Sequence, residues 1–114
     1  MATVKLDWTV PNVEDIQNVR VFRFTGDYAA LAAADATLDL ATTDTGGNGR
    51  LLDAENAEKF VALAGSQQLE SQTYVAGAGT HEDSTATFSN TYIYGVFSHN
   101  SGGYGPGELE LQTT

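Results

Sequence analysis

Residues 4–10 read Val-Lys-Leu-Asp-Trp-Thr-Val, and apolar and polar side chains alternate through the whole stretch. Leu6 and Trp8 would share one face of an extended chain with the two valines, and the polar residues would share the other face. A period of two is typical of an antiparallel strand with one buried face. The stretch therefore predicts a half-buried strand near the start of the chain.

Other short segments have the same character. Residues 19–25 place Val19 and Val21 on one face and two phenylalanines on the other. Residues 91–99 and 107–113 alternate on either side of a glycine-rich turn. Weaker patterns predict strands at 37–43, 71–76 and 85–89, with a loop at 77–84.

The middle of the chain, about 28–80, is less regular. Residues 28–36 are rich in alanine and fit either a short helix or a packed loop. Residues 42–49 contain three glycines and predict a turn.

Residues 51–64 have the chemistry of a helix. Asp53 can cap its N-terminus, Phe60 lies at helical spacing from the apolar residues that follow, and Gly65 can end it. A strand over 59–63 is the competing assignment, and we favour the helix.

Two spacings at the ends of the chain carry a family resemblance. Pro11 follows Trp8 by three residues, and Phe88 and Thr91 precede Tyr94 at fixed intervals. In these positions the chain resembles a fibronectin type III-like module, an immunoglobulin-like β-sandwich, of the bacterial and phage kind.

The resemblance implies a fold and several structural roles. We expect an all-β, antiparallel two-sheet β-sandwich with one short helix in an insertion at about 28–80, as a single domain over 1–114. Tyr94 would be the tyrosine-corner residue, with its ring in the core and its hydroxyl bonded to nearby backbone. Asn100 would open the last turn. The expected core between the sheets is Leu6, Trp8, Val19, Val21, Tyr94 and Val96.

The composition excludes several classes of protein. The 114 residues contain no cysteine, which excludes disulfides, thiolate metal sites and cysteine nucleophiles. Fifteen acidic and five basic residues give a net charge of −10, so nucleic acid and anionic membranes are poor partners. No apolar run is long enough for a membrane span, and the start has no secretory-signal pattern, so any export would need another route.

Candidate catalytic groups are few. His81 lies in a polar loop sequence, and His99 follows Ser98 without the strained turn that a nucleophilic serine needs. We therefore expect a protein that is not an enzyme and carries no catalytic residues.

Residues 44–55 contain the ligand pattern of a calcium loop. The candidate metal ligands are Asp44, Asn48, the carbonyl of Arg50, and Glu55. Gly49 would make the sharp turn, whereas Gly46 offers no side chain at the third position. The alternative is a glycine-rich turn that leads into a helix capped by Asp53. We expect no other cofactor.

These observations predict a binding protein. The first hypothesis is a non-enzymatic virion structural protein, a phage capsid decoration or tail-associated module whose partners are other protein subunits. We expect its contacts at residues 2–5, 108–113 or 28–36, where sheet edges and the insertion lie. The alternative is a glycan-binding or adhesion module, assisted by calcium and placed outside the cell or on its surface. That alternative predicts an exposed aromatic beside polar residues, on which a sugar would stack. Trp8 could serve as such a platform in principle, but its place in an alternating apolar run favours the core.

Overall fold

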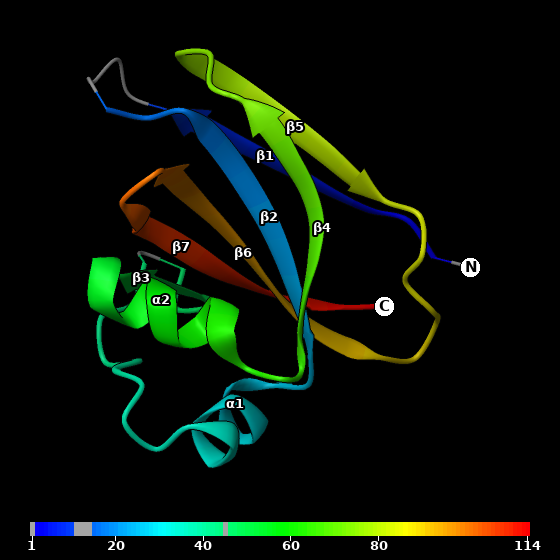
Figure 1. Ribbon diagram of the computed structural model, residues 1–114. Coiled ribbons are helices and arrows are strands. Elements are labelled where there is room, and N and C mark those ends of the chain that lie inside the picture. The colour runs from blue at the N-terminus through cyan, green and yellow to red at the C-terminus, as the bar shows by residue number, and fades with distance from the viewer. Residues whose placement is uncertain (1, 11–14, 45) are drawn as a thin grey trace.

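The computed structural model describes residues 2–10, 15–44 and 46–114 (Figure 1). These residues form seven strands and two helices. Their bounds are β1 (Val4–Val10), β2 (Asn18–Thr25), α1 (Tyr28–Ala34), β3 (Gly49–Leu52), α2 (Ala54–Ala62), β4 (Ser66–Thr73), β5 (Gly77–Asp83), β6 (Thr91–Asn100) and β7 (Gly103–Thr113).

The strands pair antiparallel in two sheets. The larger sheet has the order β3-β7-β6-β2-β4, and the smaller sheet consists of β1 and β5. The two helices pack on one face of the larger sheet, and the smaller sheet packs on the opposite face (Figure 1). The predicted all-β, two-sheet sandwich is confirmed, and its insertion holds two helices instead of one.

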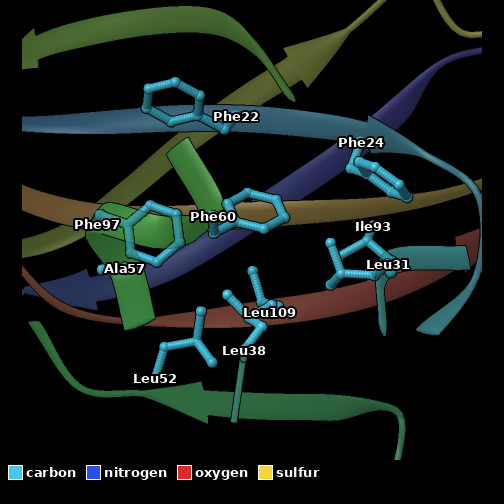
Figure 2. Close-up of a cluster of buried hydrophobic side chains, with 10 residues drawn as sticks. All are labelled: Phe22, Phe24, Leu31, Leu38, Leu52, Ala57, Phe60, Ile93, Phe97 and Leu109. Carbon is cyan, nitrogen blue, oxygen red and sulfur yellow. The ribbon is translucent and has the colours of Figure 1, made fainter. Parts of the chain in front are cut away.

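One core lies between the larger sheet and the helices (Figure 2). Phe60 of α2 packs against Phe97 of β6 with ring centroids 5.7 Å apart. Leu31 of α1 and Leu109 of β7 are fully buried in the same cluster. Each helix therefore buries apolar side chains against the sheet, which explains why the insertion is helical.

A second core lies between the larger sheet and the smaller one. Leu6 of β1, Val21 of β2 and Tyr94 of β6 are buried here, and Val19 is buried beside them. The two remaining residues of the predicted core, Trp8 and Val96, are only half-buried. The prediction that these two are buried between the sheets therefore holds only in part, because they pack against the core but also border a cleft.

Tyr94 departs from the role that the resemblance implies. Its ring is in the core, but its hydroxyl donates to Oδ2 of Asp83 at 2.7 Å and not to backbone. Arg23 donates to the same oxygen, also at 2.7 Å. Two further positions do not support the resemblance: Phe88 is 69% exposed, and Pro11 lies outside the described residues.

The strands predicted at 37–43 and 85–89 are wrong. In both segments polar side chains satisfy several backbone N–H groups, and the first segment pairs with β3 only through an isolated bridge of Thr43 to Arg50. Asn56 accepts from the backbone N–H of Asp39 at 2.8 Å, and Asp83 accepts from that of Thr85 at 2.9 Å. Side-chain hydrogen bonds of this kind stabilise turns in place of strands.

The loop predicted at 77–84 is wrong as well, because this segment forms β5 and pairs with β1. Gly79 lies opposite Trp8, and a Cβ atom on Gly79 would come within 2.2 Å of the indole Nε1. The glycine that suggested a loop thus makes room for the indole inside a strand. The strand predicted at 71–76 begins earlier, as β4, and ends at Thr73.

The helix predicted at 51–64 is confirmed with shorter bounds. Asp53 is the N-cap and accepts from the backbone N–H of Asn56 at 2.9 Å. The helix ends at Ala62, before Gly65, and the alternative strand over 59–63 is wrong. Leu52 pairs with β7 as part of β3, a short strand that the sequence pattern did not indicate.

Candidate functional site

A cleft of about 760 Å³ separates β1 from the larger sheet on the face opposite the helices. Its residues come from β1, β3, β6 and β7, together with Val19 of β2 and Ile16 just before it. Ligand-binding clefts in proteins commonly have volumes of about 300–1,000 Å³. The cleft is therefore large enough to hold a ligand or a segment of another chain.

The cleft runs along a free edge of β1. Lys5 and Asp7 point to one face of this strand and Leu6 and Trp8 to the other, yet all four line the cleft. Residues from both faces can meet one cleft only along the edge of the strand. No residue of β5 lines it, so this edge is the one opposite β5, and β1 pairs with no other strand in the described part of the chain.

The floor of the cleft is acidic. Along β7, Leu109 and Leu111 contact the helix-side core. Because side chains alternate along a strand, the residues next to them, Glu108 and Glu110, point to the opposite face. Glu108 and Glu110 consequently project into the cleft. Among the described residues, neither carboxylate has an ion-pair partner.

A third carboxylate lies beside this floor. The Asp44 carboxylate lies so close to Gly49 that a Cβ atom on this glycine would be 2.2 Å from its Oδ2. Gly49 is in turn the cross-strand partner of Glu110. Burial, followed by the charges of Asp44 and Glu108, raises the pKa of Glu110. The three carboxylates therefore repel one another and favour a cation nearby.

Apolar groups complete the cleft. Trp8 and Val96 are half-buried on its two sides, and Leu51 of β3 is 41% exposed at its outer end. The cleft thus combines an indole and aliphatic surface with a net negative charge, since one lysine and three carboxylates line it. This chemistry suits long side chains that have an apolar stem and a positive head.

The structure brings together two of the three contact segments that the sequence predicted. Lys5, from segment 2–5, lines the same cleft as Glu108, Glu110 and Gln112 from segment 108–113. Segment 28–36 is far from them in the fold, because α1 packs on the helix-side core through Leu31. The sequence could not place the cleft itself, since its walls depend on the pairing of β1 with β5.

The predicted calcium segment forms a turn that its own side chains fill. Gly47, with a φ of +79°, makes the sharp turn in place of Gly49, and its N–H donates to Asp44 at 2.8 Å. Arg50 donates to the carbonyl oxygens of Gly47 and Gly49 at 2.7 and 3.0 Å. The Arg50 guanidinium group therefore already binds two backbone carbonyl oxygens of this turn.

Glu55, predicted as the last ligand of the loop, pairs with Lys59 at 3.6 Å instead. The backbone carbonyl of Asn48 accepts from the Tyr28 hydroxyl and from the backbone N–H of Leu111 in β7. The described residues contain no group of three or more His, Cys, Asp or Glu that could hold a metal ion. The structure thus agrees with the alternative, a turn before a helix capped by Asp53, and gives the calcium prediction no support.

The two histidines have separate surroundings. His81 pairs with Glu70 across the gap between β5 and β4. His99 bonds to Asn18 at 2.7 Å, and its ring packs on Tyr104 with centroids 4.7 Å apart. Both histidines make contacts between neighbouring strands.

Comparison with known proteins gave no match: no family model, no curated protein and no solved structure is significantly similar to this chain. The resemblance to fibronectin type III-like modules therefore remains a prediction. Within the described residues, neither helix has the length and apolar character needed to cross a membrane.

Proposed function

We propose that this protein is a non-enzymatic module that docks on a larger protein assembly through the cleft beside β1. The observation that carries the proposal is the free edge of β1, which lies along an apolar and acidic cleft. Unpaired strand edges present backbone donors and acceptors that another chain can use. The acidic floor supports a basic protein partner and disfavours nucleic acid and anionic membranes.

The assembly that we propose is a virion, with the protein decorating a capsid or associating with a tail. This part of the proposal rests on the resemblance of the chain to phage modules. A capsid or tail offers the same docking site in many symmetric copies, so a small module can occupy the particle densely.

The test is to purify particles from an infection in which this protein carries an epitope tag. We expect the protein to migrate with intact particles through a density gradient, in repeated copies. Binding should weaken but persist in about 1 M salt, where the Debye length is about 3 Å and apolar contacts remain. A protein that stays at the top of the gradient as a free monomer would contradict the proposal.

A second candidate function is glycan binding by an adhesion module. Trp8 favours it, because a half-exposed indole beside carboxylates and Gln112 resembles the stacking platforms on which sugars bind. Saturable binding to a glycan array, lost in Trp8→Ala, together with indifference to particle proteins, would select this function over docking.

A further inference from the structure

We infer that β1 accepts an extended, lysine- or arginine-containing segment of a partner protein as an additional strand of the smaller sheet. The inference rests on the proposed docking function and names the kind of segment that the cleft would bind. The added strand would pair with the free edge of β1 and lie over the acidic face of β7.

The first argument is the incomplete cover of the larger sheet. The smaller sheet has two strands and the larger has five. The core beneath the smaller sheet draws on β2, β4 and β6 and includes no described residue of β7 or β3, so these two strands are left without a strand above them. In Figure 1, β1 lies between β5 and the β7 side of the molecule. A strand added to β1 would extend the smaller sheet across the cleft, over Glu108 and Leu51.

The second argument is the state of the two outer edges of the larger sheet, which are β3 and β4. The outer edge of β3 is covered, because Leu51 donates to Thr42 at 2.9 Å and Thr43 bridges to Arg50. β4 is interrupted by a register shift opposite Val21, and Gln72 of β4 donates to the carbonyl of Thr80 on β5 at 2.8 Å. Bulges and covering groups block strand addition. The edge of β1 has neither among the described residues.

The third argument is charge and shape. Within the described part of the chain Glu108 and Glu110 form no ion pair, while Trp8 and Val96 offer apolar surface in the same cleft. A lysine or arginine can pack its methylene stem on the apolar walls and bring its charged head to the carboxylates. A second copy of this chain fits less well, because its net charge of −10 would repel the first.

The binding experiment uses the full chain and a synthetic, end-capped peptide of seven alternating lysines and valines, the length of β1. We expect saturable binding, with NMR shift changes concentrated in β1 and β7. The matched peptide of alternating glutamates and valines should bind at least about tenfold more weakly. A lysine–valine peptide in which three alternate backbone amides are N-methylated should also bind about tenfold or more weakly than the unmethylated peptide. N-methylation removes the backbone donors that would pair with β1.

Variants locate the site. Glu108→Gln with Glu110→Gln should weaken binding of the lysine peptide about three- to tenfold. The matched control, Glu55→Gln with Glu82→Gln, removes the same two charges at exposed positions outside the cleft and should leave the affinity unchanged. Equal loss in both double variants would mean that only net charge acts, and would overturn the inference.

Other outcomes are equally decisive. Equal affinity for the N-methylated peptide, shifts that fall outside β1 and β7, dimerisation of the protein through β1, or displacement of the peptide by a sugar would each overturn strand addition. If the protein joins particles but the cleft variant joins them as well as the wild type, the docking function stands and this inference fails. If the peptide binds as expected but no particle contains the protein, the inference stands and the proposed virion function fails.

Discussion

At the scale of single residues, Asp83 connects the two sheets. Its side chain is 2% exposed, and it accepts hydrogen bonds from Arg23 of β2, Tyr94 of β6 and Thr85. Burial, the largest influence, would raise the pKa of Asp83, but the hydrogen bonds from Thr85, Tyr94 and Arg23 together outweigh it and lower the pKa to about 2. One carboxylate thus fixes the position of the smaller sheet on the larger one.

Asp83→Asn should lower the free energy of unfolding at pH 7 by about 3 kcal/mol, because it leaves the half-buried Arg23 without its ion-pair partner. The folded-state pKa lies below the ordinary value of 3.8, so the stabilisation is present above that value and is lost as the pH falls toward 2. Urea denaturation from pH 2 to 7 measures both effects. Asp7→Asn, in the exposed pair with Lys5, is the control and should change stability little. Equal effects of the two substitutions would contradict this role for Asp83.

Glu110 should show the opposite dependence on pH. Its folded-state pKa is raised above the ordinary value of 4.5, so its contribution to stability is complete below that value and is lost as the pH rises through the folded-state pKa. Glu110→Gln should therefore stabilise the protein at pH 7 and flatten its melting temperature between pH 4 and 7. Glu82→Gln, at an exposed position of β5, is the control. The prediction is that acidification stabilises the wild type more than it stabilises Glu110→Gln. Equal stabilisation of the two proteins would contradict it.

At the scale of elements, the sequence predicts those whose signals are local. The alternation of β1 and the cap of α2 at Asp53 are visible in neighbouring residues, and both predictions are confirmed. β5 could not be predicted, because the reason for Gly79 in a strand is the indole of Trp8, about seventy residues away in the chain. The cleft could not be predicted for the same reason, although both segments that line it were expected to make contacts.

Gly79→Ala tests how closely β1 and β5 are fitted to each other. The added methyl would come within 2.2 Å of Trp8 Nε1, so the indole must move outward. We expect a loss of about 1–3 kcal/mol in the free energy of unfolding, as in other overpacked sites. The fluorescence of this single tryptophan should shift to the red. Gly46→Ala is the control, since the nearest atom to its new methyl is 3.8 Å away. Unchanged stability and emission in Gly79→Ala would contradict the packing.

At the scale of the whole molecule, one sheet has two different coverings. The helices cover one face of the larger sheet, and phenylalanines from β2, β6 and α2 fill the core between them, as Figure 2 shows. The smaller sheet covers only part of the second face and leaves the cleft over β7. The larger cluster of buried residues thus lies on the helix side, and the cleft lies on the other side.

This asymmetry predicts that the smaller sheet opens before the larger one. β1 and β5 hydrogen-bond to each other as strands and to no other strand among the described residues, whereas β6 is paired on both edges. Regions with few buried contacts open locally at a lower free energy than the core. Amides of β1 and β5 should therefore exchange with deuterium faster than those of β6 in the native protein. Asp83→Asn should accelerate exchange in β1 and β5 more than in β6, because it releases the bonds that tie β5 to β2 and β6.

The same measurement connects this opening to binding. If a partner segment adds to the free edge of β1, its hydrogen bonds should slow exchange of the β1 amides that point away from β5, and leave β6 unchanged. Protection of β1 equal to that of β6 without any ligand would show that the smaller sheet is already as stable as the larger one. In that case strand addition would have no weak element to stabilise, and the fold would present a rigid cleft in place of an incomplete sheet.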